Sequence, residues 1–174
     1  MAIREIIRMG HPTLRQVARP ILPAELAEPW LHELIEDMQE TLPAAGGIGL
    51  AAPQVNVPVR VAIIEIDGGP SRYGDIEAIP LTVFINPEIE VLDPATAGYW
   101  EGCLSVPGLR GFVERPQHVR VSALDLQGQE FTLELQGFLA TVFQHEFDHL
   151  DGKLYVDRLK DIRLLVFEDQ LSAL

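Results

Sequence analysis

The sequence predicts an α+β fold in which antiparallel β-sheets pack around a central helix, with an amphipathic helix nearer the N-terminus. Apolar residues repeat with a helical period in two separate windows, and alternate as in strands over most of the intervening chain. The strands follow one another across short turns, which favours antiparallel pairing over βαβ units. With 174 residues, 47% hydrophobic and 22% charged, the chain has the size and composition of a single domain spanning residues 1–174.

The first helix is expected from Pro29, where a missing N–H costs little, to about Pro43. One face carries apolar residues at three- and four-residue steps, namely Trp30, Leu31, Leu34, Ile35, Met38 and Leu42. The opposite face is acidic and is expected to be solvated, with Glu33, Glu36, Asp37 and Glu40.

Strands are expected where apolar residues alternate or form short runs, at residues 59–66, 81–86, 88–92, 118–126 and 130–135. Residues 67–80 are rich in Gly and Pro and predict a loop, while Pro87 separates two of the strands. Residues 127–129 predict a hairpin turn. A second helix is expected from Phe138 to a stop at Gly152, and a short amphipathic segment over residues 161–171.

Charge and cysteine content limit the possible functions. A net charge of -13 argues against binding to DNA or RNA duplexes and to anionic membrane surfaces. No run approaches the roughly 18 apolar residues of a membrane helix, and the N-terminus lacks signal-peptide features, so a cytoplasmic, membrane-free protein is expected. The single cysteine, Cys103, excludes an internal disulfide and fits a reducing compartment.

The second predicted helix contains the motif H-E-x-x-H, at residues 145–149. His145 and His149 are four residues apart, so they lie on one helical face and can bind one metal ion. Glu146 follows the first histidine, where the general base for a metal-activated water is needed. The motif therefore predicts a catalytic metal site.

The third ligand decides the class of hydrolase. A metzincin requires histidine where Tyr155 stands, and a methionine downstream of the motif, which the chain lacks. A thermolysin-like site requires a later glutamate, for which Glu168 is the candidate. The remaining ligand is Cys103, within E-G-C-L-S at residues 101–105, where Gly102 permits close approach of the backbone to a metal or substrate.

A glycine-containing segment, G-I-G-L-A-A-P-Q at residues 47–54, lies upstream. It lacks the lysine and spaced third glycine of nucleotide-binding loops. The glycines are better explained by a close approach of the backbone to another group, and Gln54 would supply an uncharged amide donor there.

The three segments together resemble the peptide deformylase family, whose motifs read G-x-G-L-A-A-x-Q, E-G-C-L-S and Q-H-E-x-D-H. All three occur complete and in the family's order, and the resemblance extends to about Arg158. It implies antiparallel sheets around the metal-binding H-E-x-x-H helix. It also implies an enzyme that removes the N-formyl group from N-formylmethionyl nascent peptides, releasing formate and a free N-terminal methionine.

The resemblance also implies roles for the matching residues. Cys103, His145 and His149 would hold the metal, and metal-bound hydroxide would attack the formyl carbon. Glu146 would act as the general base, while the Gln54 amide and the Leu104 backbone N–H would stabilise the oxyanion. By position, the substrate would contact Ile48, Gly49, Gly102, Phe138, Thr141 and Val142. For the three helical residues of this set, ordinary core packing is the alternative.

Residues around the ligands are expected to support them. Glu101 is expected to hydrogen-bond near a ligand and to pair with Arg115, and Asp148 either does the same or faces solvent. Arg110 is expected to be a surface residue, with contact to the peptide backbone as the alternative.

Ligand chemistry alone suggests zinc, because one thiolate and two imidazoles are its common donors. The family resemblance instead implies Fe2+ as the physiological ion, with Zn2+, Ni2+ or Co2+ in purified protein. The implied partners are N-formylmethionyl peptides and nascent chains, with transient ribosome contact. Many bacterial members dock through a long basic C-terminal helix, which residues 161–174 do not provide, so a contact would need a local patch such as Arg4, Arg8, Arg15 and Arg19.

Overall fold

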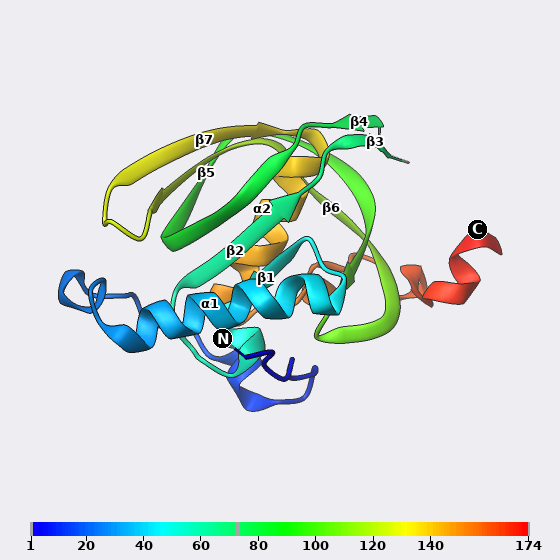
Figure 1. Ribbon diagram of the computed structural model, residues 1–174. Coiled ribbons are helices and arrows are strands. Elements are labelled where there is room, and N and C mark those ends of the chain that lie inside the picture. Colours follow the sequence, from blue (N-terminus) through cyan, green and yellow to red (C-terminus); the bar gives the residue numbers. More distant parts are fainter. Residues whose placement is uncertain (1, 72–73, 174) are drawn as a thin grey trace.

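The computed structural model describes residues 2–71 and 74–173 (Figure 1). One curved antiparallel sheet has the strand order β1-β2-β5-β6-β7, with β8 added to β6, and a small second sheet pairs β3 with β4. The helices and strands are α1 Pro29–Ala45, β1 Gly49–Ala51, β2 Val61–Ile66, β3 Gly69–Ser71, β4 Gly74–Ile76, β5 Ile79–Cys103, β6 Val106–Leu124, β7 Glu130–Gln136, α2 Gly137–Asp148 and β8 Leu165–Phe167. Seven 3-10 helices lie in the described chain, at Pro12–Arg15, Pro23–Glu25, Ala52–Val55, His149–Asp151, Tyr155–Arg158, Ile162–Leu164 and Glu168–Ala173.

Strand β2 separates the two main hydrophobic clusters. Its side chains alternate between the two faces of the sheet, as a period of two requires. Ala62 and Ile64 belong to the cluster that α2 completes, whereas Val61 and Ile63 belong to the cluster that α1 completes. The sheet therefore lies between the two helices, and α2 is enclosed within its curve (Figure 1).

Helix α1 begins at Pro29 as expected, but it continues past Pro43 to Ala45. Gly46 ends it in the left-handed conformation, with φ of 69°, and donates to the carbonyls of Leu42 and Pro43. The expectation of a wholly solvated acidic face is wrong at Asp37, which is buried. Its carboxylate accepts hydrogen bonds from the N-terminal segment, which covers this part of the helix.

The strands expected at 81–86 and 88–92 are parts of one strand, β5, which continues to Cys103. A register shift at Ile85–Glu88 accommodates Pro87, and Asn86 has a positive φ of 49° there. Strand β6 likewise begins at Val106, well before the expected start, and forms a long hairpin with β5.

The expected loop at 67–80 contains the hairpin of β3 and β4, a correction to the sequence prediction. Residues 161–171 do not form one continuous amphipathic segment. They form a 3-10 turn, strand β8 and part of a final 3-10 helix. Strand β8 pairs with Leu109–Gly111 of β6 and so fixes the C-terminal segment against the sheet.

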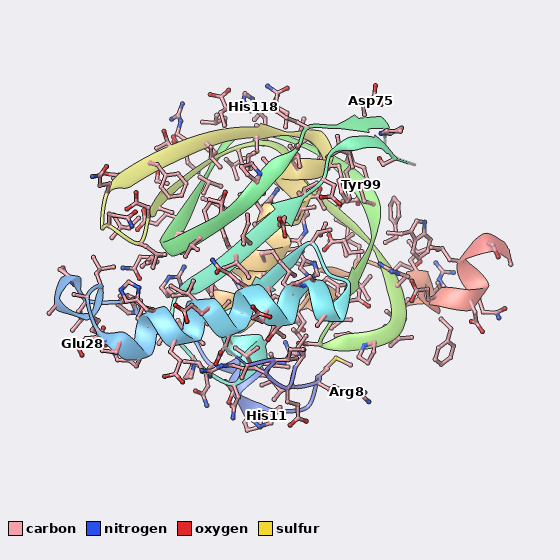
Figure 2. The ribbon with its side chains drawn as sticks, in the orientation of Figure 1. Arg8, His11, Glu28, Asp75, Tyr99 and His118 are labelled. Carbon is pink, nitrogen blue, oxygen red and sulfur yellow. The ribbon has the colours of Figure 1, made fainter. Side chains whose placement is uncertain are left out.

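Helix α2 ends at Asp148, and a 3-10 turn carries the chain on to Gly152, the expected stop, where φ is 69°. In the described part of the chain, no helix is long and apolar enough to cross a membrane. Charged side chains such as Arg8, Glu28 and Asp75 lie exposed at the periphery (Figure 2).

Candidate active site

A cavity of about 540 Å³ lies between the chain at 45–49, the β5–β6 turn and α2. Its wall contains every predicted site residue except His149, namely Ile48, Gly49, Gln54, Gly102, Cys103, Leu104, Phe138, Thr141, Val142, His145 and Glu146. His149 is buried directly behind the wall, 1% exposed. The fold therefore assembles three sequence segments that are far apart along the chain.

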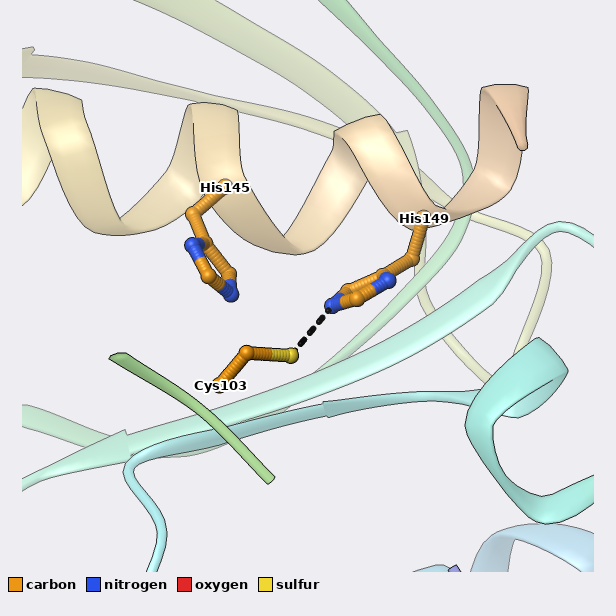
Figure 3. A group of neighbouring side chains, drawn as sticks. All are labelled: Cys103, His145 and His149. Atoms are coloured by element: carbon orange, nitrogen blue, oxygen red, sulfur yellow. Dashed lines mark hydrogen bonds between the residues drawn. The ribbon is translucent and has the colours of Figure 1, made fainter. Parts of the chain in front are cut away.

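Three side chains with metal-ligating atoms converge in this wall. The ligand atoms of Cys103, His145 and His149 all lie within 4.8 Å of one another. Cys103 Sγ is 3.4 Å from His149 Nε2, and both imidazole rings face the sulfur (Figure 3). Cys103 ends strand β5, while His145 projects from the last turn of α2 and His149 from the 3-10 turn that follows it. One thiolate and two imidazoles are donors that suit a divalent transition-metal ion.

His145 is oriented by residues behind it. Its Nδ1 lies 2.7 Å from Glu101 Oε1, which leaves Nε2 on the cysteine side. Glu101 also accepts two hydrogen bonds from Arg115, as expected. Arg115 donates in addition to Asp148, and Asp148 accepts from Arg158, so Asp148 faces this buried network and not the solvent.

Tyr155 was not identified from the sequence as part of this site. Its ring stacks on His145, with centroids 5.9 Å apart and an interplanar angle of 19°. The Tyr155 ring therefore packs against one face of the imidazole. The sequence signal was the aromatic residue six positions after the last motif histidine, which core packing explained equally well.

The electrostatics of the site favour a thiolate. Burial opposes ionisation of Cys103, but the adjacent His149 and His145 outweigh it and lower the pKa of the thiol to about 5. Burial also opposes protonation of His145, yet Cys103 and Glu101 raise its pKa well above the ordinary value of 6.5. The thiolate is the ligand form of cysteine, so a metal ion would displace a proton from the imidazole and keep the sulfur ionised.

Gln54 is held in one orientation. Its Oε1 accepts the backbone N–H of Ala51 at 2.9 Å, which assigns Nε2 to the cavity side. Nε2 then donates to Ser105 Oγ at 3.2 Å and lies 3.6 Å from Cys103 Sγ. Ser105 is the S of E-G-C-L-S, and its role in holding Gln54 could not be read from the sequence.

Glu146 is buried against Gly49. A Cβ added at Gly49 would lie 2.5 Å from Glu146 Oε1, so any larger residue would displace the carboxylate. Glu146 Oε2 has no hydrogen-bond partner among the described residues. Burial raises the pKa of this carboxyl. An acid–base group with a free oxygen therefore faces the cavity beside the cysteine and histidines.

The apolar part of the cavity comes from α2. Val142 and Phe138 both line the cavity and pack on the hydrophobic cluster around α2. They are therefore core residues and cavity-lining residues at the same time. Thr141 is buried and its hydroxyl accepts a hydrogen bond from Gln117. Ile48 lies opposite and is 41% exposed.

The thermolysin-like alternative is wrong. Glu168 lines the cavity, but its carboxylate is paired with Arg110 and it does not belong to the group of potential metal ligands. The third member of that group is Cys103. Arg110 is thus at the rim of the cavity rather than on an unrelated surface.

An α+β fold with H-E-x-x-H and a converging thiol defines the class of metal-dependent hydrolases. A family model described as polypeptide deformylase matches residues 3–164. The chain belongs to this family, whose members are metal-dependent enzymes. The mixed helix and antiparallel sheet architecture is that of the solved deformylases.

Relatives and solved structures agree over nearly the whole chain. The peptide deformylase of Leptospira biflexa is 42% identical over 173 residues, covering 99% of this chain and 97% of that protein. That of Cellvibrio japonicus is 48% identical over 163 residues, covering 94% and 90%. The class I type b peptide deformylase from Acinetobacter baumannii, solved with Met-Ala-Ser bound, gives a TM-score of 0.83 at 37% identity, covering 91% and 99%. The enzyme from Synechococcus elongatus, solved with actinonin, gives 0.80 at 36% identity, covering 92% and 80%.

Proposed function

We propose that this chain, as one catalytic domain over residues 1–174, hydrolyses the N-formyl group of N-formylmethionyl peptides. The products are formate and a peptide with a free N-terminal methionine. The observation that carries the proposal is that Cys103, His145 and His149 converge at the wall of the cavity that Glu146 and Gln54 also line. The Met-Ala-Ser bound to the Acinetobacter baumannii enzyme has the sequence of such a product.

Cys103, His145 and His149 would hold one divalent ion, Fe2+ in the cell and Zn2+, Ni2+ or Co2+ in purified samples. The donor set and the hydrogen bond from His145 to Glu101 support this assignment. When bound, such an ion acidifies a water molecule and polarises the carbonyl that it contacts.

Glu146 is the general base. Its Oε2 is buried without a protein partner, so it is available to take a proton from the attacking water. Burial raises the pKa of the carboxyl, so it binds the proton more readily, and the same oxygen can return that proton to the leaving nitrogen. The two transfers let the C–N bond break without expelling an amide anion.

Gln54 and Leu104 stabilise the developing negative charge on the formyl oxygen. The Gln54 amide is fixed through Ala51 and Ser105, so the N–H that now points at Cys103 Sγ is the one that would donate to the oxyanion. The Leu104 backbone N–H directly follows Cys103 and is the second donor. Removing one such donor typically reduces kcat by about 100- to 1,000-fold.

The methionine side chain occupies the apolar part of the cavity, beside Phe138, Thr141 and Val142. Strand β1 is at the edge of the sheet, so an extended peptide can add to it at Ile48 and Gly49. Gly102, the predicted substrate contact on the opposite side, lies under the guanidinium of Arg110. This arrangement would bind a short extended peptide, such as the N-terminus of a nascent chain.

Because nascent formylated chains emerge from ribosomes, the enzyme would act in the cytoplasm and contact ribosomes transiently. The basic patch expected for that contact is weakened, because three of its four arginines are paired with carboxylates: Arg4 with Asp37, Arg15 with Asp157 and Arg19 with Glu25. These pairs reduce its attraction for a polyanion.

The test is formate release from formyl-Met-Ala-Ser by the anaerobically prepared, metal-loaded protein. The proposal predicts turnover of this peptide and little turnover of acetyl-Met-Ala-Ser, whose extra methyl group must fit beside Glu146 and Gln54. Equal hydrolysis of both, or cleavage of an internal peptide bond without formate release, would contradict it.

A further inference from the structure

The cavity mouth carries a pair of charges that the proposed reaction does not use. Arg110 lies on β6, and Glu168 begins the last 3-10 helix. Glu168 Oε1 accepts a hydrogen bond from Arg110 Nε at 3.1 Å and a shorter one from Nη2. Their side chains are 32% and 55% exposed, unlike the buried Glu101 and Glu146 deeper in the same wall.

Arg110 is fixed close to the reacting centre. Its guanidinium lies over the Cα of Gly102, because a Cβ there would lie 2.5 Å from Arg110 Cζ. Gly102 precedes Cys103 in the chain. Strand β8 holds Glu168 in place, since Val166 pairs in register with Arg110 itself. Strand β8 therefore brings the Glu168 carboxylate to this guanidinium.

The pair determines the charge of the cavity mouth. Among the described residues of the cavity wall, Arg110 is the one arginine or lysine. Glu168 cancels its charge, so the mouth is neutral while the pair is intact. Arg110 lies over Gly102, a predicted substrate contact, so an extended peptide would pass this pair with the residues that follow the methionine.

We propose that Glu168 is a specificity-determining residue, which neutralises Arg110 and prevents a preference for acidic residues directly after the methionine. The inference rests on the proposed deformylase activity. Without Glu168, Arg110 attracts an aspartate and repels a lysine at these positions. Without Arg110, Glu168 produces the opposite preference.

The experiment compares kcat/KM for formyl-Met-Asp-Ala and formyl-Met-Lys-Ala, both as C-terminal amides. In the unaltered enzyme, the Asp-to-Lys ratio is expected to stay within about threefold of unity, as for a neutral, solvent-exposed site. Glu168→Gln is expected to raise the ratio about fivefold, and Arg110→Gln to lower it. The double variant should restore the original ratio, and 0.5 M NaCl should shrink the effect of the single variants.

The matched control is Glu114→Gln, which removes the acidic partner of another exposed pair, with Lys160, outside the cavity wall. Its ratio should equal that of the unaltered enzyme. An unchanged ratio in Glu168→Gln, or a shifted ratio that persists in the double variant, would overturn the inference. If the unaltered enzyme releases no formate from either peptide, the proposed function itself fails, so the two failures are distinguishable.

Discussion

Replacing Arg115 by methionine should destabilise the protein strongly. Arg115 is 3% exposed, and its guanidinium donates to Glu101 at 2.7 and 3.1 Å and to Asp148 at 2.8 Å. Breaking a buried ion pair from one side costs about 3–5 kcal/mol, because a carboxylate remains buried without its partner. Asp148 keeps Arg158, so we expect about 3 kcal/mol, the lower end of that range.

Urea unfolding followed by circular dichroism measures this loss in chelator-treated protein. For a chain of this size, about 3 kcal/mol corresponds to a Tm lower by roughly 6–12 °C. Arg120→Met is the matched control on the same strand, since Arg120 pairs with Glu90 at 43% and 63% exposure and should cost less than about 1 kcal/mol. Metal affinity should also fall, by about 10- to 100-fold in Arg115→Met only, because Glu101 no longer holds His145 firmly. Equal losses in the two variants would refute the reasoning.

Three further predictions concern single sites. Glu146→Gln should retain one metal per chain by elemental analysis while kcat falls about 100- to 10,000-fold, and an active variant would exclude Glu146 as the base. Gly49→Ala should lower kcat with little change in Tm, because the added Cβ displaces the Glu146 carboxylate; wild-type kcat would show that the carboxylate is free to shift. Asp157→Asn tests pH linkage: burial is outweighed by Arg15 and the Leu154 N–H, which lower the Asp157 pKa below 3.8. The ionised aspartate therefore stabilises the fold above that pH, by less than about 1 kcal/mol because the pair with Arg15 is exposed. The difference in unfolding free energy between Asp157→Asn and wild type, measured by urea unfolding, should vanish as the pH falls through the pKa of Asp157 in the folded protein. A difference that persists at lower pH would contradict the linkage.

The parts of the site that lie on local patterns could be predicted from the sequence. The spacing of His145 and His149 on a helix requires only local geometry, and so does the position of Glu146 between them. The pairing of Glu101 with Arg115 was also expected and is confirmed. The placement of His145, Glu146 and His149 depends on one short motif whose chemistry restricts the residues that can occupy it.

The remaining features depend on contacts between distant segments. Residues 93–97 of β5 are exposed, so this part of the strand shows no apolar alternation. Asp37 is buried by the N-terminal chain, which a helical pattern does not reveal. Glu168 reaches the cavity only because β8 pairs with β6, and its partner Arg110 therefore could not be assigned from the sequence.

The central claim is that Cys103, His145 and His149 hold the ion with which Glu146 hydrolyses a formyl group. The most direct measurement determines metal content and formate release on the same anaerobic, Fe2+-loaded sample, with formyl-Met-Ala-Ser as substrate. We predict one ion per chain and rapid formate release, with both lost in Cys103→Ala. Full metal content and unchanged formate release in Cys103→Ala would contradict the account.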